Sequence, residues 1–171
     1  TRVLLPAGIL ICTLGLLGFA ARDALWPAAT VRVVPVLVKA DDTAVAADPL
    51  RAAARSHIEA WGGRAATDSV GYRLVREFRR TLSDEILAGL TEPVTAADPD
   101  FRTWRLGQSE AAVWRLLNER PPGLLPAGAV SWRELMLRVL DSTVDNLVQQ
   151  YGSLDRATWG GRNTVWIRHP L

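Results

Sequence analysis

The sequence predicts a mainly α-helical protein with one short β segment near its C-terminus. Apolar residues recur at four-residue spacing through residues 70–90, and helix-capping residues with proline and glycine breaks recur from Asp48 onward. Alternation typical of a strand is confined to residues 164–169, where Val165, Ile167 and His169 alternate with Thr164, Trp166 and Arg168. With 171 residues, 49% hydrophobic and 22% charged, the chain can bury a core and is not a disordered sequence.

Charge and metal-binding residues restrict the function classes. The net charge of +2, from 20 basic and 18 acidic residues, is too small to indicate nucleic acid as a partner. Cys12 is the single cysteine, so no intrachain disulfide can form. With only His57 and His169 as histidines, no zinc site is expected, and no cofactor is expected either.

The N-terminal segment Val3–Ala21 runs 19 residues without a charge. At about 1.5 Å per residue it nearly crosses a bilayer core of about 30 Å. Three interpretations stay open: a membrane anchor, the apolar region of a secretory signal with Gly18 and Ala20 at its cleavage site, or a buried core helix. The first two place the protein in the periplasm or cell envelope, anchored in the inner membrane if the span is retained.

An extended linker is expected between this segment and the helices. Thr30–Ala40 is rich in β-branched residues, and Pro35 confines it to an edge or extended conformation. Taken with the apolar span, Leu25–Ala40 resembles the stretch that follows the membrane anchor in periplasmic adaptor subunits of secretion systems. We therefore divide the chain into residues 1–40 and a mostly helical part, residues 41–171.

Two helices are expected in the first half of this helical part. Asp48 caps the first, Pro49 begins it, and it ends near Trp61, before Gly62 and Gly63. Thr67, Asp68 or Ser69 caps the second, whose apolar stripe needs a packing partner and consists of Val70, Leu74, Phe78, Leu82, Ile86 and Leu90.

Two further helices are expected in the second half. The third spans roughly Ser109 to Glu119 and stops before Pro121 and Pro122. Ser131 begins the fourth and forms a capping box with Glu134. The apolar positions of this helix point inward and are Leu135, Val139, Leu140, Leu147 and Val148.

Polar candidates for chemistry have structural explanations. The second helix carries a basic cluster of Arg73, Arg76, Arg79 and Arg80, interleaved with Glu77, Asp84 and Glu85. Because Arg73 with Glu77 and Arg80 with Asp84 are neighbours at i,i+4, a solvated helix face is favoured over a phosphate-binding face. The segment Ala96–Asp100 offers two carboxylates, those of Asp98 and Asp100, but too few oxygens for calcium, so a loop is expected over these residues.

Aromatic residues and His169 are the remaining candidates for a functional site. The tryptophans near helix ends and in loops fit packing better than an apolar substrate pocket, and they are Trp61, Trp104, Trp114, Trp132, Trp159 and Trp166. His169 could act as a base, but no nucleophile is identifiable beside it. No nucleophile elbow, phosphate loop or H-E-x-x-H motif is present. The residues alone therefore identify no active site.

Four ordered blocks resemble the penicillin acylase (penicillin amidase) family. The first, Ala46–Leu82, contains a W-x-G-x-x-x-x-x-S-x-x-Y-x-L pattern before a long helix. It is followed by "WRLLNERPPGLLP" and "SWRELMLRVL", and then by "TWGGRNTVWIRHPL", Thr158–Leu171, which is similar to the family's T-W-G-x-x-N…H-P-L landmark. The resemblance covers about residues 46–171.

The resemblance implies an N-terminal nucleophile hydrolase with a four-layer α/β/β/α sandwich. Its members cleave linear amides, including the acyl side chains of β-lactams and acyl-homoserine lactones, through a serine activated by its own α-amino group. The family's nucleophile and oxyanion-hole residues lie upstream of the matched segment, so no catalytic residue maps onto this chain. Thr1 stands outside any family motif and is not assigned as the nucleophile. Family members can bind calcium, but no ligand maps here.

We therefore expect a fragment of such an amidohydrolase, inactive alone. An acyl-amide substrate would bind only in the complete enzyme, and the remainder of that enzyme is the expected partner. Residues 1–40 look like material from elsewhere, joined by fusion or by sequence assembly. The alternative is a membrane-anchored periplasmic helical interaction module, with Val3–Ala21 as its anchor.

Overall fold

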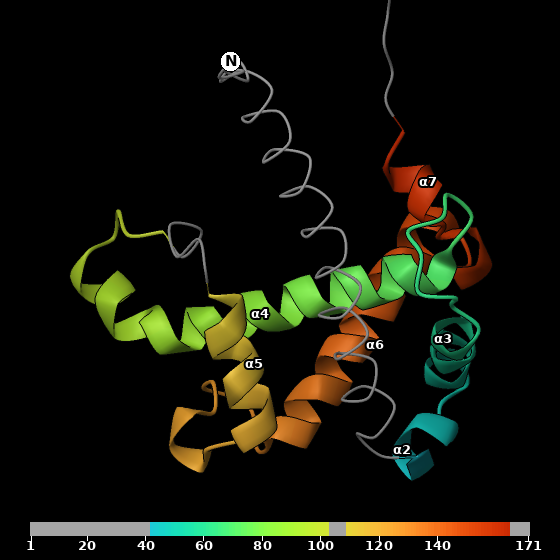
Figure 1. Ribbon diagram of the computed structural model, residues 1–171. Coiled ribbons are helices and arrows are strands. Elements are labelled where there is room, and N and C mark those ends of the chain that lie inside the picture. Colours follow the sequence, from blue (N-terminus) through green and yellow to red (C-terminus); the bar gives the residue numbers. More distant parts are fainter. Residues whose placement is uncertain (1–41, 103–108, 165–171) are drawn as a thin grey trace, which may run out of the picture.

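The computed structural model describes residues 42–102 and 109–164 (Figure 1). The predicted mainly α class is confirmed for this part, and the β segment expected at residues 164–169 lies outside it except for Thr164. The elements in chain order are α2 (Asp42–Ala46), α3 (Pro49–Glu59), α4 (Val70–Ala97), α5 (Glu110–Glu119), η2 (Pro122–Leu124), α6 (Trp132–Tyr151), η3 (Leu154–Arg156) and α7 (Trp159–Arg162).

Helix α4 is the central element of the fold. It packs across α6, while α3 contacts both of these helices and α5 packs against α4 (Figure 1). The apolar stripe predicted for α4 is buried from Val70 to Ile86, with Leu90 packed against the edge of the core. The stripe predicted for α6 faces it, so the two sequence patterns form one core.

Side-chain caps begin the helices where the sequence indicated. The Asp48 carboxylate accepts the backbone N–H groups of Leu50 (2.8 Å) and Arg51 (3.0 Å) at the start of α3. Of the three candidate caps of α4, Ser69 is used, since its hydroxyl accepts the Tyr72 N–H at 3.0 Å.

The capping box of α6 differs from the predicted form. The Ser131 hydroxyl accepts the Glu134 N–H at 3.1 Å, as expected. However, the Glu134 carboxylate accepts the N–H of Val130 at 3.3 Å, one residue before the cap.

The ends of the helices agree less well with the sequence prediction than their starts do. Helix α3 ends at Glu59 with Ala60 as its cap, slightly before the predicted position. Helix α4 continues through Pro93 to Ala97, so Ala96 and Ala97 are helical and the predicted loop begins at Asp98. Gly152 ends α6 at φ +81°, a left-handed conformation that favours glycine.

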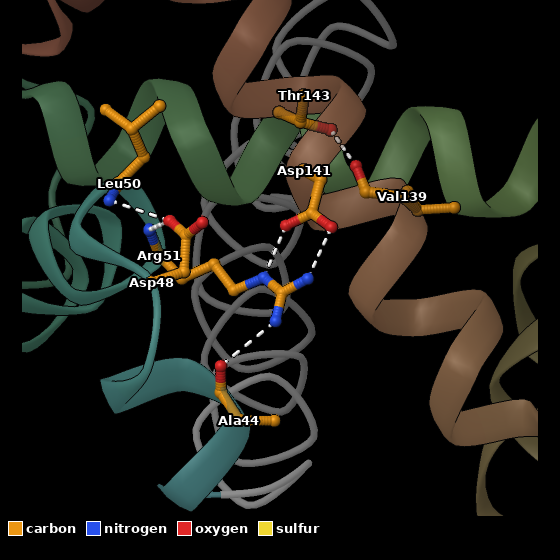
Figure 2. A network of polar contacts seen from close by, with 7 residues as sticks. All are labelled: Ala44, Asp48, Leu50, Arg51, Val139, Asp141 and Thr143. Atoms are coloured by element: carbon orange, nitrogen blue, oxygen red, sulfur yellow. Dashed lines mark hydrogen bonds and ion pairs between the residues drawn. The ribbon is translucent and has the colours of Figure 1, made fainter.

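Arg51 connects three elements at the base of the fold (Figure 2). Its Nε and Nη2 donate to the two carboxylate oxygens of Asp141 on α6, at 2.5 and 2.6 Å, and its Nη1 donates to the Ala44 carbonyl of α2 at 3.0 Å. The hydrogen bonds to Asp141 raise the pKa of Arg51. The bidentate pair therefore fixes α3 against α6, and the hydrogen bond to the Ala44 carbonyl holds α2 beside them.

No helix within the described ranges has the length and apolar character needed to cross a membrane. The candidate span Val3–Ala21 lies outside these ranges, as does the linker Thr30–Ala40. The expectations made for residues 1–40 therefore stay predictions.

Candidate functional site

Two segments that carry the sequence landmarks meet in space at the N-terminal end of α4. The Trp159 N–H donates to the Ser69 carbonyl at 3.0 Å, and the Gly160 N–H donates to the Thr67 carbonyl at 2.6 Å. The Thr158 hydroxyl caps α7 by accepting the Gly161 N–H at 3.2 Å. The T-W-G-x-x-N segment thus forms a short helix held by backbone hydrogen bonds against the loop before α4.

Three aromatic side chains, Trp61, Tyr72 and Trp159, form what we call the aromatic junction. The ring centroids of Trp61 and Tyr72 lie 5.6 Å apart, and the Trp159 ring meets Tyr72 edge to face at 4.9 Å. The Arg76 guanidinium lies 5.0 Å from the Trp159 ring centroid, within cation–π range. For these tryptophans, the packing role is confirmed.

Close backbone approach explains two glycines at this junction. A Cβ on Gly71 would overlap the His57 carbonyl oxygen and come within 2.7 Å of the Trp61 Cβ, so the close backbone approach at this point requires a residue without a side chain on α4. A Cβ on Gly160 would lie 2.7 Å from the Thr67 carbonyl oxygen. Both landmark segments therefore depend on glycine for their contact.

Beside the junction, three arginines surround one carboxylate. We call Arg73, Arg80 and Arg162, together with Glu77, the arginine cluster. Arg162 of α7 donates to Glu77 Oε1, while Arg80 Nη2 lies 3.2 Å from Oε2 and Arg80 Nε donates to it at 3.3 Å. Arg73 Nε lies 3.5 Å from Oε1. Glu77 thus joins α4 to α7 through Arg162, and it also offsets the positive charges of Arg73 and Arg80 on its own helix.

The prediction that this basic cluster lies on a solvated helix face is wrong for Arg73 and Glu77, at the centre of the cluster. Arg73 is 3% exposed and Glu77 is 8% exposed, because Tyr151 and the α7 segment cover this side of α4. Burial lowers the pKa of Arg73, although Glu77 and Tyr151 oppose the shift. The prediction holds at the margins, where Arg80 is exposed, but Arg80 pairs with Glu77 instead of Asp84.

A hollow of about 440 Å³ lies next to the junction, between the end of α3 and the start of α4. It is lined by Trp61, Arg64, Asp68 and Ser69, with His57 at its edge. His57 Nε2 lies 3.0 Å from Asp155 Oδ1, so the imidazole is held by a carboxylate of η3. The Ser69 hydroxyl already caps α4, so this hollow gives a histidine–carboxylate pair but not a nucleophile activated by it.

The remaining candidates fall into three groups. Trp132 is buried with its indole N–H donating to the Pro121 carbonyl at 3.1 Å, and Trp114 packs at the edge of the core. The Asp98 carboxylate accepts the Asp100 N–H at 3.0 Å in the expected loop. Other candidates lie outside the described residues, and these are Thr1, Cys12, Trp104, Trp166 and His169.

Metal ligands do not gather within residues 42–102 and 109–164, where no three His, Cys, Asp or Glu side chains converge on a point. The contacts that do converge are the aromatic junction and the arginine cluster. Sequence reasoning found their residue types but not Tyr151, Arg162 or the pairing of His57 with Asp155, because each joins segments far apart in the chain.

Comparison with known proteins identifies the family. The model for penicillin amidase matches residues 20–171, and the chain belongs to this family. The match begins before the Ala46 start of the sequence resemblance and includes Leu25–Ala40, which we had related to secretion adaptors. No curated protein and no solved structure shows a significant match to the chain. The penicillin acylase resemblance is thereby confirmed.

Proposed function

We propose that this chain is the helical scaffold section of a penicillin-amidase-type amidohydrolase, which cleaves linear amides such as the acyl side chains of β-lactams or acyl-homoserine lactones. The observation that carries the proposal is the family match over residues 20–171. Supporting it, the two landmark segments of the resemblance meet at the aromatic junction, although about ninety residues separate them.

In this proposal the chain positions catalytic residues that it does not itself supply. The Ser69 and Thr67 carbonyls hold α7, which leads directly into residues 165–171. Fixing α7 on the buried end of α4 would present both landmark segments as one surface to the remainder of the enzyme. The serine nucleophile and oxyanion donors would come from that remainder, in the periplasm or cell envelope.

An activity assay tests the proposal in two arms. The purified chain, incubated with chromogenic phenylacetyl and long-chain acyl amides, should give no turnover above a buffer blank. The chain joined to the upstream part of its own open reading frame should give turnover, and this turnover should disappear when the first serine of the mature large subunit is replaced by alanine.

Turnover by the isolated chain would show that it carries its own nucleophile. Inactivity of the joined polypeptide on every amide would favour the membrane-anchored interaction module instead. That module depends on Val3–Ala21, outside the described residues, and it stays a prediction.

A further inference from the structure

The arginine cluster carries an unbalanced charge. Arg73, Arg80 and Arg162 all direct a guanidinium at Glu77, so three positive charges share one carboxylate. Within residues 42–102 and 109–164, Glu77 is the only ion-pair partner of Arg80 and of Arg162. By contrast, Arg115 pairs one to one with Glu119, and Arg138 is one arginine between two carboxylates, Glu85 and Glu134.

Sharing leaves the buried arginine poorly satisfied. The Arg73 Nε and Nη1 atoms are fully buried without a hydrogen-bond partner in the described part of the chain. The separation of 3.5 Å between Arg73 Nε and Glu77 Oε1 exceeds the usual N–H···O range of about 2.7–3.2 Å. Arg162 donates to the same Oε1 atom, so it competes with Arg73 for it. A buried donor without a partner is costly, and here the shortage is of carboxylate oxygens.

The two outer arginines are accessible. The side chain of Arg80 is 62% exposed and that of Arg162 is 45% exposed, whereas that of Glu77 is 10% exposed. Because they bind different oxygens of one carboxylate, their guanidiniums flank it and lie close to each other. Each retains N–H groups that Glu77 does not use, and guanidinium forks favour carboxylates.

We propose that Arg80 and Arg162 form a docking site for a carboxylate on an acidic protein surface, namely one carried by the remainder of the enzyme. A second carboxylate between these two guanidiniums would draw Arg162 away from Oε1, and Glu77 would then close on Arg73. The partner's identity rests on the proposed function, whereas the site rests on the geometry of the cluster. A protein surface is favoured over a free acid because both guanidinium-bearing side chains are exposed and neither lines the hollow beside the aromatic junction.

Fluorescence anisotropy with a labelled oligo-glutamate peptide tests the site at low ionic strength, where exposed charges are least screened. The full chain should bind the peptide, and Arg80→Gln/Arg162→Gln should bind it at least about tenfold more weakly, since two charge-assisted contacts are lost. Arg115→Gln is the matched control, because it removes one exposed helical arginine from a one-to-one pair and should bind like the wild type.

The single variant Arg80→Gln provides a second test in case the double variant does not fold. It leaves the contact between Arg162 and Glu77 intact, and this contact joins α7 to α4. It should weaken peptide binding several-fold with an unchanged far-UV circular dichroism spectrum. Absence of binding by the wild type would overturn the proposal, as would wild-type affinity of Arg80→Gln or an equal loss in Arg115→Gln. Free glutarate binding as tightly as the peptide would also overturn it, because the site would then be one for a small acid.

This measurement involves no amide turnover. An inactive joined polypeptide would thus overturn the proposed function without affecting the binding result, and absent peptide binding would overturn the docking site without affecting the family's chemistry.

Discussion

The two ends of α4 differ although they belong to one continuous helix. At the N-terminal end, every residue from Val70 to Val75 is buried, including a glycine, a tyrosine and an arginine. At the C-terminal end, every residue from Glu92 to Ala97 is exposed. In Figure 1 the first end lies against α3 and α7, and the other projects past α5.

This difference shows what an amphipathic pattern can and cannot specify. A stripe at four-residue spacing specifies one buried face, and that face is buried as expected along most of α4. Burial of the other faces depends on segments that cross the helix, and only the N-terminal end is crossed by α3 and α7. The end that carries the family landmarks is therefore the end where polar residues are also enclosed.

The largest effect on the free energy of unfolding should come from truncating a core side chain near the N-terminal, enclosed end of α4. Phe78 is 1% exposed, so Phe78→Ala removes a buried ring and leaves a cavity. We expect a loss of about 3–5 kcal/mol in the free energy of unfolding, measured by urea denaturation. Val94→Ala, at the projecting end of the same helix and 47% exposed, should change it by less than about 0.5 kcal/mol. Similar losses for the two variants would mean that the ends do not differ.

Removing the shared carboxylate should have the next largest effect. Glu77→Gln leaves Arg73 buried and charged without a counter-ion, and we expect a loss of about 3 kcal/mol in unfolding free energy. Glu119→Gln disrupts an exposed pair and should cost less than about 1 kcal/mol. Combining Glu77→Gln with Arg73→Met, which replaces the guanidinium by an apolar chain, should recover most of the loss. A neutral Glu77→Gln would show that the cluster is not electrostatically coupled.

A smaller effect is expected from Gly71→Ala. Alanine normally stabilises a helix relative to glycine by up to about 1 kcal/mol. Here the new Cβ would overlap the His57 carbonyl oxygen, which is backbone and cannot rotate away. We therefore expect a net loss of about 2 kcal/mol, together with a change in tryptophan fluorescence as Trp61 shifts. Gly123→Ala is the control, because no atom lies within 4 Å of its new Cβ, and its unfolding free energy should be within about 0.5 kcal/mol of the wild-type value. An increase in unfolding free energy for Gly71→Ala would contradict the close contact with the His57 carbonyl.

Local signals made most of the helical fold predictable from the sequence. The caps at Asp48, Ser69 and Ser131 and the apolar spacing along α4 and α6 depend only on residues within one or two turns. The end of α4 has no such local signal, because proline usually interrupts a helix and α4 nevertheless continues past Pro93 to Ala97. Family membership was also accessible, since ordered motifs identify it without any knowledge of packing.

The candidate site was predictable in its residue types but not in its arrangement. The pattern Arg73, Glu77, Arg80 is typical of a solvated helix face, and nothing within α4 indicates that Tyr151 and Arg162 enclose it. This enclosure depends on contacts between segments about eighty to ninety residues apart, and the spacing of residues within one helix does not predict such contacts. Gly71 and Gly160 are the one sequence signal of this enclosure, because a glycine inside a helix or a short motif often marks a close approach of another backbone segment.

The smallest effect should come from the projecting end. Pro93 lacks the N–H that would bond to the Gly89 carbonyl, and proline in a helix interior is about 3 kcal/mol less favourable than alanine. Yet Glu92–Ala97 is exposed and can unfold locally without opening the core, so Pro93→Ala should raise the global unfolding free energy by less than about 1 kcal/mol. Hydrogen exchange should detect the change where urea does not, as slower amide exchange at residues 93–97. A gain of several kcal/mol in the urea experiment would instead place this end within the cooperative core, and the contrast between the two ends of α4 would no longer hold.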